Sequence, residues 1–312
     1  MNRLEQAILR TILYADVFNY PMTAREITHF LIADFPYCLD DIQAALDQSC
    51  HLSRLVETQA GYFYCAGRGE LVSIRTAREQ ASEHLWNQAI QYGVWLGALP
   101  FVRMVALTGA LAMRNAAHPK DDLDYVLVTS PGRVWLARLF AVMLVRVVKL
   151  RGVVLCPNYV LSETALGQNN HSLYIAHELA QMVPIIGQDR YVQMRAANAW
   201  VVEAMPNAGA AFYIEACQGP SRAARFGQTL IERALGGALG DALERWEHRR
   251  KIKRLIPKLT TTVPHDARLD HEHVKGHFQD HGHPVMQQYY ARLRRYNLDD
   301  SISSAEMPLA GD

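Results

Sequence analysis

The sequence contains no long run of apolar residues. Its longest uninterrupted apolar stretch, residues 139–145, is far shorter than the roughly twenty residues that a membrane-spanning helix needs. Arg138, Arg146 and Lys149 break the pattern on either side. The segment 134–154 is therefore expected to be a helix packed on a sheet. The beginning of the chain has the spacing of an amphipathic helix and not the pattern of a signal peptide, so we expect a cytoplasmic protein.

Cysteine is scarce, and neither sign of charge dominates. The five cysteines are scattered without the paired spacing of a metal site, which is typical of reduced thiols in a cytoplasm. The net charge of +1 gives the whole chain no signal for binding a polyanion. With 312 residues, half of them hydrophobic, the chain is long enough for about two domains with a sizeable core.

Two histidine patterns fall short of a metal site. His177 and Glu178 begin the zinc-protease pattern H-E-x-x-H, but Gln181 stands where the second histidine belongs, so we expect a structural or substrate-facing histidine. Six histidines lie within residues 265–283. Their irregular spacing and the lack of a nearby cysteine favour a surface loop over a metal centre.

The most informative stretch, residues 104–129, has the pattern strand, tight turn, helix, loop, strand. The apolar run 102–107 suits a buried strand. It ends at Thr108 and Gly109, where the lack of a Cβ lets the backbone turn sharply or approach a ligand closely. Good helix formers follow in residues 110–115. Backbone N–H groups at such a turn are suited to binding phosphates.

Asp122 comes directly before the second apolar strand, and Asp124 lies within it. They lie two residues apart, so both side chains leave from the same face of the strand. Two neighbouring carboxylates repel each other and need compensation. A hard divalent cation with oxygen ligands, usually Mg²⁺, supplies that compensation, and phosphates complete its coordination.

This stretch resembles the nucleotidyltransferase superfamily related to DNA polymerase beta. The resemblance rests on an apolar strand, a glycine with a small residue after it and an Asp-x-Asp on the next strand. Here the motif falls on Gly109-Ala110 and on Asp122-x-Asp124. The resemblance implies an α/β fold, a mixed sheet with flanking helices. It further implies that two Mg²⁺ ions (or Mn²⁺) bind Asp122 and Asp124, with a nucleoside triphosphate as substrate.

The resemblance also assigns nucleotide-binding residues around the turn. The segment Thr108, Gly109 and Ala110 would bind the phosphates. Arg114 and Lys120, in the loop that follows, would screen the phosphate charge.

Two positions depart from the pattern of this superfamily. The small residue after the glycine is usually serine or glycine, but here it is Ala110. The superfamily also has a third carboxylate on a later strand, which activates the attacking hydroxyl. That strand is expected at 153–162, where the inward polar candidates are Cys156 and Asn158, with Glu163 at the end. Asn158, the candidate catalytic residue there, can coordinate a cation but cannot accept a proton.

Residues 1–72, which we call the N-terminal module, are expected to contain three helices followed by a hairpin. Thr23 and Glu26 have the spacing of a capping box that opens the second helix. Two short runs, 55–58 and 62–65, flank a turn and predict the hairpin. This order of elements resembles a winged helix.

The charge of the N-terminal module argues against DNA as its partner. Residues 1–80 contain seven arginines, no lysine and ten acidic residues, a net charge of −3. The expected third helix carries Asp40, Asp41 and Asp47, which would repel DNA phosphates. We therefore expect this module to contact a protein or to cover a substrate.

The rest of the chain is expected to form a nucleotidyltransferase core (73–175), a helical C-terminal domain (176–298) and a disordered tail (299–312). Within the C-terminal part the pattern predicts helices over 189–205 and 221–254. The basic end of the latter is either a solvated helix end or a clamp for phosphates.

The leading hypothesis is an enzyme that transfers a nucleoside monophosphate from Mg²⁺-NTP to an unidentified acceptor and releases pyrophosphate. The alternative is a catalytically degenerate nucleotide sensor whose N-terminal module docks a protein partner. A DNA-binding regulator is a third possibility. The acceptor, the nucleobase and the oligomeric state stay open.

Overall fold

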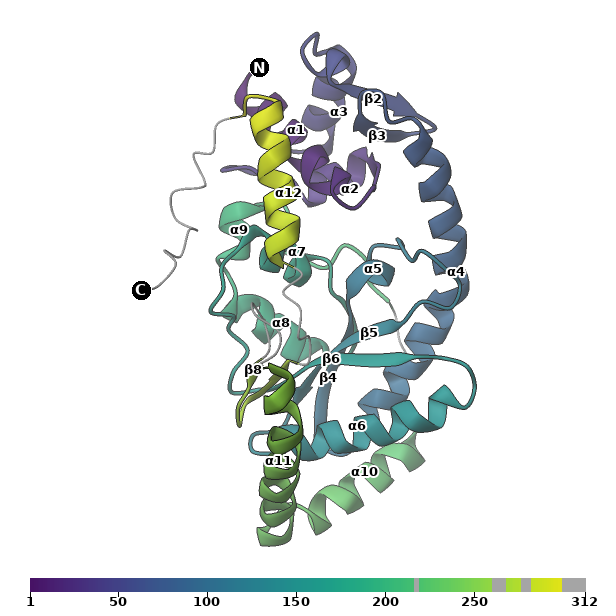
Figure 1. Cartoon of the computed structure of the whole chain (residues 1–312), viewed down its shortest axis with the longest axis vertical. Helices are drawn as coiled ribbons and strands as arrows, with labels where there is room; N and C mark the ends of the chain where they lie inside the picture. Colours follow the sequence, from purple (N-terminus) through teal and green to yellow (C-terminus); the bar gives the residue numbers. More distant parts are fainter. Residues whose placement is uncertain (216–218, 260–267, 276–281, 299–312) are drawn as a thin grey trace.

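The computed structural model describes residues 1–215, 219–259, 268–275 and 282–298 (Figure 1). The tail predicted at 299–312 lies outside these ranges. Within them, no helix has both the length and the apolar character needed to pass through a membrane.

The N-terminal module begins with helix α1 and ends with a small antiparallel sheet of strand order β1-β3-β2. The predicted capping box is confirmed, since the Thr23 hydroxyl accepts from the Glu26 N–H (3.2 Å) and the Glu26 carboxylate accepts from the Thr23 N–H (2.8 Å). The predicted hairpin is also confirmed. In chain order the elements are α1 (Arg3–Asp16), β1 (Met22–Thr23), α2 (Ala24–His29), α3 (Leu39–Gln48), the 3₁₀ helix η1 (Leu52–Arg54), β2 (Val56–Gln59) and β3 (Tyr62–Cys65).

A long helix, α4 (Glu70–Gly97), leads from the module to a six-stranded mixed sheet of order β7-β4-β5-β6-β9-β8 (Figure 1). Strands β5 and β6 are parallel, and the other neighbouring pairs are antiparallel. The strands are β4 (Val102–Leu107), β5 (Leu123–Thr129), β6 (Leu155–Ser162), β7 (Val183–Ile186), β8 (Arg268–Leu269) and β9 (His273–Lys275).

The two faces of the sheet bury different side chains. Along β5, Tyr125 and Leu127 pack with α4 and with α6 (Val134–Lys149), while Val126 and Val128 pack on the opposite side. Successive residues of a strand point to opposite faces, so Asp124 lies on the side of Val126. That side is covered by the N-terminal module and by α7 (Leu173–Ala180).

The C-terminal part is not wholly helical, contrary to the expectation for residues 176–298. It contributes β7, β8 and β9 to the main sheet. These strands are short, and pairing with distant strands decides their conformation, which the local pattern does not reveal. The helices of this part are α8 (Gln188–Ala197), α9 (Val201–Ala204), α10 (Arg222–Ala234), α11 (Ala238–Leu259) and α12 (Gly282–Arg295).

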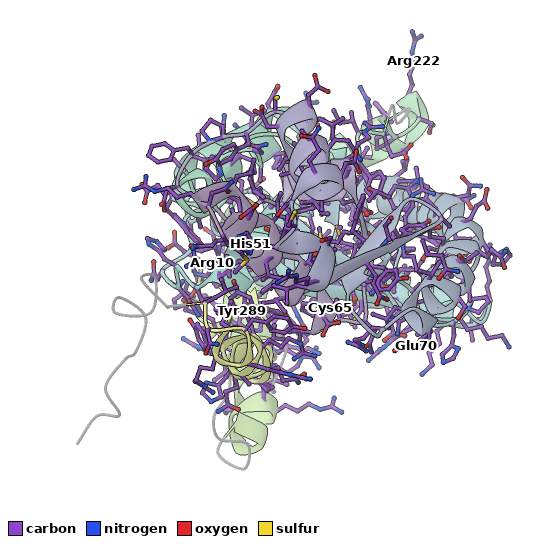
Figure 2. The ribbon with its side chains drawn as sticks, turned by 90° about the horizontal axis from the view of Figure 1, so that it is seen from above. Arg10, His51, Cys65, Glu70, Arg222 and Tyr289 are labelled. Carbon is purple, nitrogen blue, oxygen red and sulfur yellow. The ribbon has the colours of Figure 1, made fainter. Side chains whose placement is uncertain are left out.

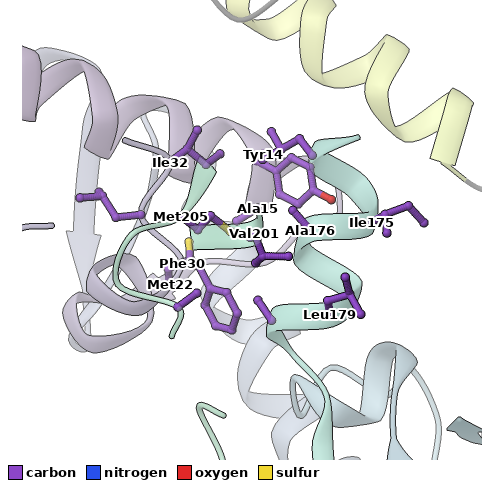
Figure 3. Close-up of a cluster of buried hydrophobic side chains, with 14 of the residues drawn as sticks. Tyr14, Ala15, Met22, Phe30, Ile32, Ile175, Ala176, Leu179, Val201 and Met205 are labelled. Carbon is purple, nitrogen blue, oxygen red and sulfur yellow. The ribbon is translucent and has the colours of Figure 1, made fainter. Parts of the chain in front are cut away.

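One apolar core joins the N-terminal module to the rest of the chain. Figure 3 shows side chains of the module packing among those of α7 and of the segment around α9. Tyr289 of α12 also packs against the module, with its ring centroid 5.4 Å from that of Tyr14. Figure 2, seen from above, shows Tyr289 beside the module and Arg222 of α10 extending away from the body of the molecule. The module is thus fixed over one face of the sheet.

Candidate functional site

A cavity of about 570 Å³ lies where the N-terminal module, the main sheet and α7 meet. Its lining includes Tyr14 and Phe30 from the module, Asp124 from the sheet and Glu178 from α7. Among the residues predicted from the sequence, Thr108, Gly109, Ala110, Asp124 and Asn158 line this cavity. The fold therefore gathers most of the predicted site on the covered face of the sheet.

Gly109 and Asp124 are in close contact. Gly109 has a φ of +67°, a left-handed conformation that favours glycine. A Cβ at this position would lie 2.5 Å from Asp124 Oδ2. The Thr108 N–H donates a hydrogen bond to the Asp124 carbonyl (3.0 Å), which fixes the turn to β5. Gly109 is thus needed both for the turn and for the space beside the carboxylate.

Asn158 reaches Asp124 because β6 contains a bulge. The register pairs Tyr125 with Pro157 and Val126 with Tyr159, so Asn158 is the extra residue. Its side-chain Nδ2 donates to Asp124 Oδ1 (2.6 Å). Burial raises the pKa of Asp124 to about 6, and the Asn158 hydrogen bond opposes this shift. The charge of Asp122 adds to the increase.

Three predicted residues lie outside the cavity lining. Asp122 is exposed and directly precedes β5. Lys120 is exposed on the preceding loop. Arg114 is half-buried, with its guanidinium 4.2 Å from the centroid of the Trp86 ring. Arg114 is therefore engaged in a cation–π contact and does not point into the cavity.

The expected third carboxylate does not come from β6. Cys156 is paired with Asp124 in the register but is absent from the cavity lining. Glu163, just beyond the strand, forms an ion pair with Arg190 (2.7 Å). Among the described residues of β6, Asn158 is the polar side chain that reaches Asp124.

Glu178 on α7 brings a second carboxylate into the cavity. Burial, with a smaller contribution from the charge of Asp124, raises its pKa to about 7. The Lys275 charge and the hydrogen bond from Gln181 Nε2 to Glu178 Oε1 (2.6 Å) act in the opposite direction. The side chain is half-buried, because part of it faces the cavity. In the sequence Glu178 stands out as part of an incomplete zinc motif, although an acid within the apolar helix LYIAHELA is itself a signal of function.

The lining also contains one lysine and one histidine. Lys275 lies on β9 opposite Tyr159 of β6, with its Nζ 5.9 Å from the centroid of the Tyr159 ring. His177 stacks on Tyr14, with ring centroids 3.8 Å apart, and its Nδ1 lies 2.9 Å from the Leu173 carbonyl oxygen. Burial lowers the pKa of His177 to about 4, so the ring is neutral at pH 7. This agrees with a structural or substrate-facing histidine.

The residues around Asp124 could hold a divalent ion only together with ligands from outside the chain. No group of three or more His, Cys, Asp or Glu side chains suited to a metal ion occurs in the part of the chain that the structure describes. Mg²⁺ commonly binds one or two carboxylates together with phosphate oxygens and water. Asp124 faces the cavity, and the charge of Asp122 acts on it, so these two carboxylates would supply the protein ligands of such an ion.

The described histidines of residues 265–283 and the basic end of α11 are absent from the cavity lining. His265, His277 and His281 lie outside the described residues, and His273 pairs with Asp270 (3.1 Å). In the basic end of α11, Arg250 and Lys251 pair with Glu247 of the same helix, at 2.6 and 3.9 Å. Glu247 is buried, so these two cations compensate the charge of a buried carboxylate.

Comparison with family models, with curated proteins and with solved structures found no match to this chain.

Proposed function

We propose that this protein is a nucleotidyltransferase that transfers a nucleoside monophosphate from a nucleoside triphosphate to an acceptor hydroxyl. The observation that carries the proposal is the contact between Gly109 and Asp124. A glycine that turns the chain against a carboxylate, with a cavity beside both, leaves room for a metal-bound phosphate.

The arrangement of the strands supports a nucleotidyltransferase-type core. Strand β4, the turn at Gly109 and antiparallel β5 follow in the order that the resemblance implies, and β6 continues the sheet in parallel. The order of elements in the N-terminal module, helix, strand, two helices and a hairpin, supports a winged helix. The aspartates of its α3 are exposed, which favours the covering of a substrate over contact with DNA.

The side chains around Asp124 have distinct roles in the proposed reaction. Asp122 and Asp124 would hold Mg²⁺, and Asn158 orients the Asp124 carboxylate. When bound, Mg²⁺ neutralises the triphosphate and lowers the pKa of the acceptor hydroxyl. Backbone N–H groups at Gly109 and Ala110 would donate hydrogen bonds to the phosphates.

Glu178 is the general base in this proposal. The acceptor oxygen forms a bond to the α-phosphorus, the bond from that phosphorus to the pyrophosphate oxygen breaks, and the hydroxyl proton passes to Glu178. A carboxylate with a pKa near 7 is well matched to accepting a proton at neutral pH.

Pyrophosphate release from ATP, GTP, CTP and UTP with Mg²⁺ tests the proposal. We expect slow release from at least one nucleotide by the wild type, with water as acceptor, and none by Asp122→Ala/Asp124→Ala. The matched control is Asp40→Ala/Asp47→Ala, which removes two exposed acids from α3, far from Asp124 in sequence, and should keep full activity. Release that is unchanged in Asp122→Ala/Asp124→Ala would contradict the proposal.

A nucleotide sensor is the second candidate, favoured by alanine at position 110 where the superfamily has serine or glycine. It predicts Mg²⁺-dependent nucleotide binding without pyrophosphate release. A wild-type protein that binds none of the four nucleotides would exclude both candidates.

A further inference from the structure

The interior of the cavity is largely apolar and aromatic. Six aromatic side chains line it: Tyr14, Phe18, Tyr20, Phe30, Tyr159 and Tyr174. Methionines fill much of the remaining wall, at positions 22, 113, 182 and 194. Apolar walls with a few polar groups are typical of sites for small organic molecules.

The charges of the lining do not suit a triphosphate in the interior. Two carboxylates, Asp124 and Glu178, face the cavity, while Lys275 is the single lysine or arginine of the described lining. His177 adds no positive charge at pH 7. A triphosphate is therefore expected at the rim, beside Gly109 and the exposed Ala110, where Mg²⁺ would balance its charge. The apolar interior is left for a different molecule.

The wall of the cavity is fixed by its own packing. Tyr14 stacks on His177, and Phe30 lies close to the same ring, with centroids 6.3 Å apart. Figure 3 shows Tyr14 of α1 beside Ala176 of α7, where these two helices meet. Aromatic rings held in this way offer flat faces on which a second ring can stack.

We propose that this cavity binds the acceptor, and that the acceptor is an uncharged aromatic compound bearing a hydroxyl group, of the phenol or naphthol class. The volume of about 570 Å³ lies within the range of small-molecule sites, roughly 300–1,000 Å³. Glu178 accepts the hydroxyl proton, and the aromatic side chains hold the ring. The identity of this molecule as the acceptor rests on the proposed nucleotidyl transfer, whereas its chemical class rests on the lining alone.

The first test uses N-phenyl-1-naphthylamine, an uncharged aromatic probe whose fluorescence rises in apolar surroundings. We expect saturable binding to the full chain. Ala110→Trp, which places an indole at the exposed rim of the cavity, should weaken binding by about tenfold or more. Ala117→Trp, at an exposed alanine outside the lining, is the matched control and should bind as the wild type does. Equal binding by both variants would place the probe elsewhere and overturn the proposal.

The second test uses the wild type, so it does not depend on how Ala110→Trp folds. 2-Naphthol should displace the probe at about tenfold lower concentration than naphthalene-2-sulfonate, because Asp124 and Glu178 disfavour an anion. Equal or reversed potency would overturn the proposed class of ligand.

Adding saturating Mg²⁺-NTP to the protein with bound probe shows whether the cavity is an acceptor site or a nucleobase site. An acceptor and a nucleotide must bind together, so the probe should remain bound when nucleotide is added. Displacement of the probe by nucleotide would assign the cavity to the base and overturn the acceptor proposal. If the wild type binds the probe but no nucleotide, nucleotidyl transfer fails while the class of cavity ligand stands.

Discussion

Glu178 and Asp124 are partly buried carboxylates, and the burial of their negative charge lowers the unfolding free energy. The pKa of Glu178 is raised to about 7 from its ordinary value of 4.5, so the folded state binds more protons than the unfolded state between these pH values. The unfolding free energy of the metal-free protein therefore falls as the pH rises from about 4.5 through 7. Ionisable groups with pKa values shifted in this way cluster at functional sites.

Glu178→Gln is expected to stabilise the metal-free protein at pH 8. The amide keeps the shape and removes the buried charge, for a gain on the order of 2 kcal/mol after allowance for solvent in the cavity. Urea unfolding at pH 4.5 and pH 8 measures the effect, which should vanish at the lower pH. Glu203→Gln on the exposed side of α9 is the control and should change neither value. A lower unfolding free energy of Glu178→Gln than of the wild type at pH 8 would contradict a raised pKa of Glu178 in the folded state.

Gly109→Ala should destabilise the protein more than Gly132→Ala does. Both glycines have a left-handed backbone, at φ +67° and +65°, so each alanine costs about 1–2 kcal/mol for that conformation. Only at Gly109 would the new Cβ also meet Asp124 Oδ2, since nothing lies within 4 Å at Gly132. Urea midpoints of the two variants measure the difference. Equal losses would mean that Gly109 does not confine Asp124.

At the scale of elements, α4 connects the sheet with the N-terminal module through a buried charge cluster. Arg75 of α4 is 2% exposed and donates from Nη2 to Glu26 Oε1 of α2 (2.9 Å). Its guanidinium also lies 3.9 Å from the centroid of the Tyr20 ring. Breaking one partner of such a buried pair leaves the other charge without compensation.

Arg75→Met is expected to lower the unfolding free energy by about 3–5 kcal/mol. Arg75→Met/Glu26→Gln should lose less than Arg75→Met alone, because the glutamine is neutral and can still form the capping box with Thr23. A double-mutant cycle in urea measures the coupling. If the losses of unfolding free energy in the two single variants add up to that of the double variant, Arg75 and Glu26 do not hold α4 to the module.

Elements with a local signal could be predicted from the sequence. The capping box at Thr23, the hairpin β2–β3 and the turn at Gly109 each depend on a few neighbouring residues. The helix expected over 189–205 is broken at Asn198, whose side chain donates to the Leu166 and Met194 carbonyls. The helix expected over 221–254 is divided between α10 and α11 at Gly236 and Gly237.

The parts that could not be predicted depend on contacts between distant segments. Strands β7 and β9 are defined by their partners β4 and β6. Glu178 enters the site because α7 packs across the sheet, and no spacing in the sequence links it to Asp124. The contact between Asn158 and Asp124 could not be predicted either, because it depends on the bulge in β6.

At the scale of the whole molecule, the continuous core predicts a single cooperative unit. Residues of the module, the sheet face and α7 share one buried cluster. Amides of α1 and of β5 should therefore exchange with solvent with similar opening free energies, measured by native-state hydrogen exchange. A module that opens at much lower free energy than the sheet would contradict a fixed cover over the cavity.

The surface of the module is not expected to bind duplex DNA. Asp40, Asp41 and Asp47 are exposed along α3, which would be the DNA-reading helix of a winged helix. Fluorescence anisotropy with a labelled duplex at physiological salt should show no binding. Micromolar affinity that falls steeply with added salt would instead favour a DNA-binding regulator.

The affinity for Mg²⁺-NTP, measured by calorimetry with the wild type and with Asp122→Ala/Asp124→Ala, tests the proposed nucleotide site most directly. We expect at least one nucleotide to bind the wild type in Mg²⁺ but not in EDTA. Loss of both carboxylates should weaken that binding by about tenfold or more, while Asp40→Ala/Asp47→Ala binds normally. Equal affinity in wild type and Asp122→Ala/Asp124→Ala, or no nucleotide binding by the wild type, would contradict the proposed site.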